Sequence, residues 1–209
     1  MERIFLLERE KGAVYRVLDK DRKNIGLIKV STSPLYIRAA IIFSGFFLAL
    51  LNYYIFVMMY ISFRVYGLMF FSLAAGFLAF AGAFFFVFIF IRLSFAPLEV
   101  KINMGEVSSV TRKISTLRFF NLKYKFSGVH PGLFELRGLI YKRLKFANES
   151  GEILFFIRKE KGFYLLKDKD DYFGYFSYVK GGMKVDLSPD LNEVIAIEQA
   201  LAAAALTRR

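Results

Sequence analysis

The 209-residue sequence contains no cysteine and a single histidine, His130. Disulfides and thiolate metal sites are therefore excluded, and a zinc site or a nucleophilic triad lacks its usual partners. The chain also lacks a glycine-rich loop of the kind that binds nucleotide phosphates. We therefore expect a protein that is not an enzyme and that holds neither a cofactor nor a metal ion.

Charge is missing from two long segments. Residues 39–63 and 65–91 contain no Asp, Glu, Lys, Arg or His, and only Arg64 separates them. At about 1.5 Å of helical rise per residue, either segment can cross a hydrocarbon core about 30 Å thick. A spanning segment must be helical in lipid, because only then are its backbone hydrogen bonds satisfied internally. We predict a transmembrane hairpin within residues 34–96, with helices at about 38–63 and 65–91.

The net charge of +12 is distributed on both sides of this hairpin. Residues 1–38 hold nine basic and five acidic residues, and residues 92–209 hold twenty and thirteen. Arg38, Arg92, Lys29 and Lys101 flank the apolar segments. The positive-inside rule therefore predicts a multi-pass protein of the cell membrane with both termini in the cytoplasm. The basic residues are interspersed with acidic ones and form no recognisable motif, so we expect membrane phospholipid rather than nucleic acid as a partner.

Two features inside the hairpin suggest helix packing. Asn52 can hydrogen-bond to a neighbouring helix, and Ala75, Ala79 and Ala83 lie four residues apart on one helical face. Small residues at this spacing allow two helices to approach closely. We expect them to pack the two helices together. The alternative is a homodimer, or contact with another membrane protein, through the same face.

The remaining sequence has the alternation of β-strands. Short runs of β-branched and aromatic residues, bounded by turn residues, occupy residues 3–30 and 98–187. About three strands are expected before the hairpin and about nine after it. Three strands are too few to be stable alone. We therefore predict one cytoplasmic β domain, formed by residues 1–33 and 97–209, into which the hairpin is inserted.

The chain ends with a predicted helix at residues 189–206. Ser188 is a good N-cap, Pro189 suits the first helical position, and Asp190 is favourable in the first turn. The helix is apolar over most of its circumference, which favours burial. The residues that we expect to be buried include Val194, Ile195, Ile197 and Leu201.

About twelve strands followed by an apolar helix resemble the family that unites phospholipid scramblases, LURP-one-related proteins and Tubby. Residues 14–21 with Ile25 and Gly26 look like the early hairpin of that family, and residues 183–187 before the last helix look like its end. The resemblance implies a closed twelve-stranded β-barrel around a hydrophobic C-terminal helix, and binding of phospholipid headgroups or of a membrane partner. An inserted transmembrane hairpin is not part of the family's usual pattern.

Two other functions are compatible with the sequence. The first is a pleckstrin-homology-like interaction module on a two-helix anchor, a fold that needs only seven strands and a final helix. The second is a structural subunit of a membrane complex. Two observations distinguish the first alternative from the barrel. One is the number of strands, and the other is whether strands before and after the hairpin join one sheet.

Overall fold

A computed structural model describes residues 3–10, 13–114, 121–137, 143–160, 163–167, 172–180, 182–188 and 197–207. The chain divides into two compact units. One unit contains the residues up to Ser31 and from Pro97 onward, and the other contains Thr32–Ala96. The insertion of one unit into the sequence of the other follows from this division.

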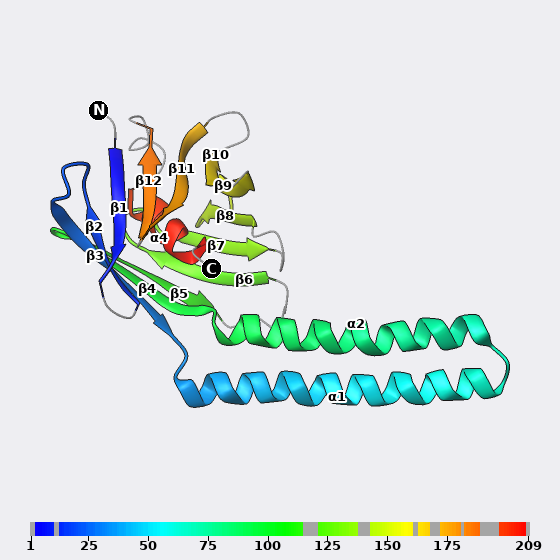
Figure 1. Cartoon of the computed structure of the whole chain (residues 1–209). Coiled ribbons are helices and arrows are strands. Elements are labelled where there is room, and N and C mark those ends of the chain that lie inside the picture. The colour runs from blue at the N-terminus through cyan, green and yellow to red at the C-terminus, as the bar shows by residue number, and fades with distance from the viewer. Residues whose placement is uncertain are drawn as a thin grey trace. The chain divides into compact units, whose positions relative to one another are not determined.

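The first unit is a closed antiparallel β-barrel, with twelve strands in the described part of the chain (Figure 1). Neighbours in sequence are neighbours in the barrel throughout. The strands are β1 (Arg3–Arg9), β2 (Val14–Leu18), β3 (Asn24–Thr32), β4 (Pro97–Met104), β5 (Val107–Ile114), β6 (Asn121–Ser127), β7 (Gly132–Arg137), β8 (Arg143–Asn148), β9 (Ile153–Glu160), β10 (Phe163–Lys167), β11 (Tyr172–Val179) and β12 (Gly182–Leu187).

Two pairings close the barrel across long stretches of sequence. β1 pairs with β12, in a register that runs from Arg3 opposite Leu187 to Glu8 opposite Gly182. β3 neighbours β4 although the whole hairpin separates them in the chain. Gly26 of β3 suits this seam, because a Cβ atom there would lie 2.4 Å from the backbone oxygen of Asn103. The prediction that strands before and after the hairpin form one barrel is confirmed.

The helix α4 (Ile197–Thr207) lies among the strands in Figure 1. Every residue from Glu198 to Thr207 is buried, so protein surrounds the helix on all sides. Consecutive alanines at positions 202–205 keep it thin enough to fit among large inward-facing side chains. Four of these are the phenylalanines Phe126, Phe134, Phe146 and Phe155, whose ring centroids lie 4.6–6.2 Å apart in the contacting pairs. The predicted barrel around an apolar C-terminal helix is confirmed.

The described helix covers only part of the predicted segment. Residues 189–196, including Val194 and Ile195, lie outside the described residues. Ile197 is partly buried, and Leu201 is completely buried in the barrel core.

The second unit is a hairpin of the helices α1 (Leu35–Val65) and α2 (Met69–Ser94). Both begin or end a few residues from the predicted limits, and Arg64 lies in the last turn of α1 rather than between the helices. The turn is at residues 66–68, where Gly67 has a φ of 73° that favours glycine. α1 and α2 contain 31 and 26 residues, and the mean hydropathies of their most apolar windows are 2.0 and 2.5. Both helices are therefore long and apolar enough to cross a membrane.

Candidate functional site

The outer face of β8 and β9 carries a groove of about 390 Å³. It is lined by Arg143, Leu144, Lys145, Ile153, Phe156, Ile157 and Arg158. Three of these side chains are cationic, and the others are apolar. A groove of this kind can bind an anion that is attached to an apolar body.

Strand alternation brings these side chains to one face. On β8, Arg143 and Lys145 point outward because Leu144 and Phe146 belong to the barrel core. On β9, Phe155 and Ile157 are buried in the same way, which turns Phe156 and Arg158 outward. The register places Lys145 opposite Phe156, and Leu144 opposite Ile157. Arg143 and Arg158 therefore both lie next to the Leu144–Ile157 pair, at one end of the groove.

Neighbouring side chains adjust the charge of the groove. Lys145 Nζ lies 3.0 Å from Glu135 Oε2, and Arg158 Nε lies 3.7 Å from Glu160 Oε1. Lys167 Nζ of β10 lies 5.6 Å from the centre of the Phe156 ring, which adds a cation beside the groove. The cations in and beside the groove are Arg143, Lys145, Arg158 and Lys167, and the anions are Glu135 and Glu160. Cations therefore outnumber anions in this set. Arginine suits phosphate because its planar guanidinium can donate two parallel hydrogen bonds.

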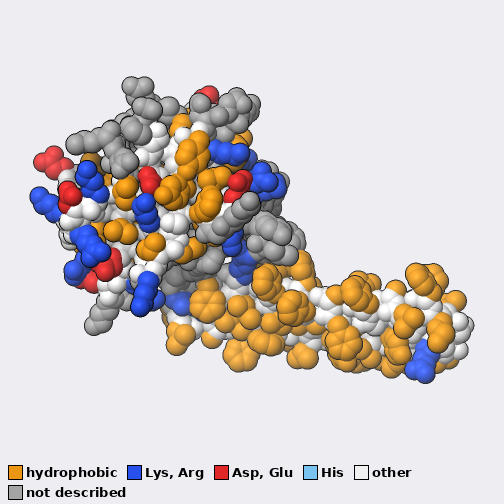
Figure 2. Space-filling model, turned by 45° about the horizontal axis from the view of Figure 1, so that its top comes forward, with side chains coloured by type: hydrophobic (Ala, Val, Ile, Leu, Met, Phe, Trp, Pro, Cys, Tyr) orange, Lys and Arg blue, Asp and Glu red, His pale blue; other side chains and the backbone are white. Residues whose placement is uncertain are grey.

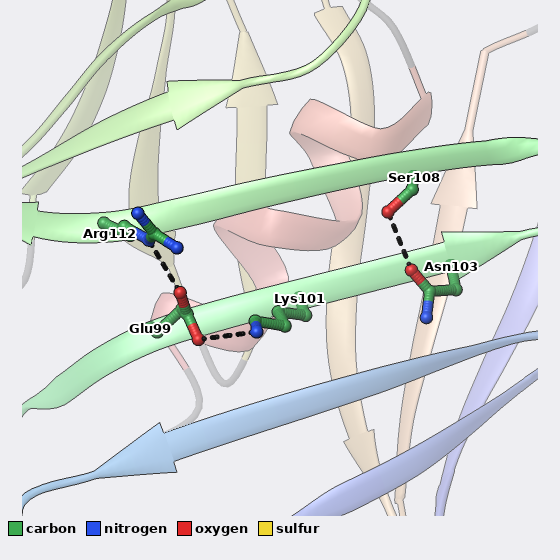
Figure 3. A network of polar contacts seen from close by, with 5 residues as sticks. All are labelled: Glu99, Lys101, Asn103, Ser108 and Arg112. Carbon is green, nitrogen blue, oxygen red and sulfur yellow. Dashed lines mark hydrogen bonds and ion pairs between the residues drawn. The ribbon is translucent and has the colours of Figure 1, made fainter.

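A second outer-face cluster lies on β4 and β5 (Figure 3). Arg112 Nε donates to Glu99 Oε1 at 2.7 Å, and Lys101 Nζ lies 3.3 Å from Glu99 Oε2. The hydrogen bond from Arg112 is the main reason why the pKa of Glu99 is lowered, and the hydrogen bond from Lys101 adds to it. Lys101, one of the predicted membrane-flanking cations, is therefore engaged with Glu99.

The other predicted flanking residues have different surroundings. Arg38 lies in the first turn of α1, where its Nε donates to the Ser33 oxygen at 2.6 Å and a second nitrogen donates to Thr32 Oγ1. Its guanidinium also lies 5.7 Å from the centre of the Phe95 ring. Arg92 lies in the last turn of α2, and Lys29 is exposed on β3. Arg38 and Arg92 thus lie at those ends of α1 and α2 that join the strands.

The predicted packing residues of the hairpin lie between its helices. Asn52 Nδ2 donates to the Ala79 oxygen at 3.2 Å, and both Ala75 and Ala79 are buried. Ala83 is half-buried. The surface that could serve a homodimer is therefore turned largely toward α1.

A third cluster is polar and lies inside the barrel. Gln199 Nε2 of α4 donates to the His130 oxygen at 2.7 Å. The neighbouring Glu198 is buried, and its Oε2 has no hydrogen-bond partner among the described residues. Desolvation by burial raises the pKa of Glu198, while the Ser109 hydroxyl and then the charge of His130 act in the opposite direction. This cluster lies in the first described turn of α4.

Among the described residues, no group of three or more His, Asp or Glu side chains lies close enough to hold a metal ion. We take the β8–β9 groove as the candidate site because it combines cationic and apolar side chains on one surface. The sequence did not predict this groove. Arg143 and Lys145 on β8 lie beside Phe156 and Arg158 on β9 only because these two strands pair in a particular register, which the sequence does not show.

Comparisons of the chain with protein-family models, with curated proteins and with solved structures found no match.

Proposed function

We propose that this protein is a membrane-tethered β-barrel of the scramblase, LURP-one and Tubby type. In this proposal it binds the headgroup of an anionic phospholipid in the β8–β9 groove and catalyses no reaction. The observation that carries the proposal is the groove itself, where Arg143, Lys145 and Arg158 lie beside Phe156 and Ile153. The cations suit a phosphate, and the apolar side chains suit the glycerol and the first acyl carbons.

The tether is the first support for a lipid ligand. Only 11% and 17% of the most apolar windows of α1 and α2 are buried within the protein. Figure 2 shows hydrophobic side chains along the whole length of the hairpin. An exposed apolar surface of this extent is stable in lipid and not in water. We propose that both helices span the cell membrane, with both termini and the β domain on the cytoplasmic side, where an anionic leaflet would attract the basic domain.

The fold is the second support. A closed barrel of twelve antiparallel strands around a C-terminal helix is the arrangement that the resemblance implies, and membership of that family is part of this proposal. The pleckstrin-homology-like alternative requires a seven-stranded domain. The barrel does not fit it, because β1 to β3 are integral members of the closed sheet. Nucleic acid is not proposed as a partner.

A charge-reversal experiment tests the groove. The full chain in detergent micelles is titrated with short-chain phosphatidylglycerol or phosphatidylcholine, and bound lipid is counted by native mass spectrometry. We expect Arg143→Glu with Arg158→Glu to weaken phosphatidylglycerol binding at least tenfold, because about 1.4 kcal/mol corresponds to that factor and two charge-assisted contacts are lost.

The matched control is Lys125→Glu with Lys20→Glu, which makes the same change of charge at exposed positions outside the groove. This control should retain phosphatidylglycerol binding within about twofold. Equal loss in both double variants would mean that only total charge matters, and unchanged binding in the groove variant would reject the groove as the site. Inorganic phosphate as a competitor separates recognition of a free anion from recognition of a lipid.

A further inference from the structure

The two ends of the barrel differ in the connections that they carry. Consecutive strands are antiparallel neighbours, so successive connections alternate between the two ends. At one end of the barrel the odd-numbered strands end and the even-numbered strands begin. We call this end the tether rim. β3 ends there and β4 begins there, so the chain enters α1 and returns from α2 at this rim. The opposite end is named the distal rim.

Exposed side chains near the tether rim are predominantly basic. Arg143 begins β8, Lys159 lies next to the end of β9, and Lys180 follows β11, and all three are exposed. The acidic residues described at this rim have basic neighbours. Glu10 forms an ion pair with Arg16, and Glu160 lies 3.7 Å from Arg158.

The distal rim has the opposite character. Acidic residues described in its connections are Asp19, Asp21, Glu106, Glu149 and Glu152. The same connections also contain three described basic residues, Lys20, Arg22 and Lys23, so acidic residues outnumber basic ones in the described part of this rim. This difference in charge between the two rims gives the barrel an electrostatic direction.

Exposed apolar side chains lie at both rims. Ile114 at the end of β5, Phe163 at the start of β10 and Val179 at the end of β11 are each about two-fifths exposed at the tether rim, while Val129 and Tyr172 are more exposed at the distal rim. Apolar exposure therefore does not distinguish the two rims, whereas charge does.

We propose that the barrel docks with its tether rim on the anionic leaflet, while its distal rim faces the aqueous phase. Cations near an anionic surface are attracted to it, and the acidic distal rim is repelled by the same surface. Only two residues separate β3 from α1 and α2 from β4, so the tether rim is the end of the barrel that the helices join in the chain. The proposal rests on the membrane tether but not on ligand binding in the β8–β9 groove.

Single cysteines can report this orientation, because the chain has none of its own. Val179→Cys marks the tether rim, and Val129→Cys, in the connection between β6 and β7, marks the distal rim. Each full-length variant is labelled with an NBD fluorophore and reconstituted into vesicles of phosphatidylcholine alone or with about 30% phosphatidylglycerol. A nitroxide on the lipid headgroup then quenches fluorophores that lie close to the membrane surface.

We expect strong quenching at position 179 that increases several-fold with phosphatidylglycerol, and weak quenching at position 129 in both lipids. Lys159→Glu with Lys180→Glu should reduce quenching at position 179 at least twofold. The matched variant, Lys20→Glu with Lys23→Glu at the distal rim, should not. Added salt on the otherwise unchanged chain should reproduce the effect of the tether-rim variant even if that variant fails to fold, because salt screens exposed charges.

Equal quenching at positions 129 and 179, or quenching that does not respond to phosphatidylglycerol and salt, would overturn the proposed orientation. The groove variants remove Arg143, which also lies near the tether rim, but they leave Lys159 and Lys180 intact. Failure of the groove with preserved quenching at position 179 would therefore reject the proposed ligand site alone.

Discussion

At the residue scale, Glu198 is an acidic side chain at the start of a helix that is otherwise apolar. It is 5% exposed, and the core residues of α4 begin two residues later with Ala200. A Cβ atom at position 128 would lie 3.0 Å from Glu198 Oε2, so Gly128 leaves the carboxyl group its space. Burial favours the neutral carboxyl group, and therefore the native state should bind this proton more tightly than the unfolded chain does.

Glu198→Gln should stabilise the barrel at neutral pH. Because the pKa of Glu198 is raised in the native state, its contribution to stability is complete below the ordinary value of 4.5 and is lost as the pH rises through the native pKa. Glutamine stays neutral, so we expect a gain of about 1 kcal/mol near pH 8 and almost none near pH 4. Urea unfolding of the full chain in detergent micelles, followed by circular dichroism, measures this difference.

The exposed Glu106 is the matched control, and Glu106→Gln should change stability equally little at both pH values. If Glu198→Gln lowered stability near neutral pH, the native barrel would need the charged carboxylate, and the argument from burial would be wrong.

At the element scale, the hairpin is held by a few close approaches between its helices. A Cβ atom at Gly82 would lie 2.6 Å from Asn52 Nδ2, and one at Gly45 would lie 2.4 Å from Phe90 Cβ. Ser72 Oγ donates to the Tyr60 oxygen at 3.2 Å, and this contact joins the helices near their turn. Glycine and small polar residues at these places let the two backbones approach closely.

Cysteines at positions 52 and 82 should therefore form a disulfide within one chain. The double variant Asn52→Cys with Gly82→Cys is oxidised in native membranes, and alkylation followed by mass measurement counts the remaining thiols. We expect loss of both thiols in the monomer, because the two positions lie within disulfide range. Asn52→Cys with Phe77→Cys, where Phe77 is 72% exposed, should keep both thiols. Cross-linked dimers in place of the intrachain bond would indicate that this face joins two chains.

Local sequence patterns predicted most of these elements. The charge-free segments specified both helices, and alternation in stretches such as residues 98–102 specified strands. Helix limits were less accurate, because the absence of charge does not show where the turn ends and the helix begins between apolar residues such as Leu68 and Met69. The groove was not predicted, since alternation shows that Arg143 and Phe156 each face outward but not that their strands are adjacent. That adjacency depends on strand pairing, which is a property of the whole sheet.

At the scale of the whole molecule, the hairpin is an insertion into a barrel that closes without it. β1 at the start of the chain pairs with β12 near its end, and β3 meets β4 across the insertion. The chain therefore joins the barrel to the helices through two neighbouring strands, with two residues in each connection.

Photocrosslinking to lipid tests whether the β8–β9 groove binds an anionic phospholipid. The full chain is reconstituted into vesicles that contain phosphatidylglycerol with a photoactivatable group on its headgroup, and the labelled residues are located by mass spectrometry. The account predicts adducts concentrated on β8 and β9, at Arg143–Asn148 and Ile153–Glu160, and their loss in the Arg143→Glu, Arg158→Glu variant. Adducts spread evenly over the barrel, or concentrated on the acidic connections around Asp21 and Glu149, would contradict it.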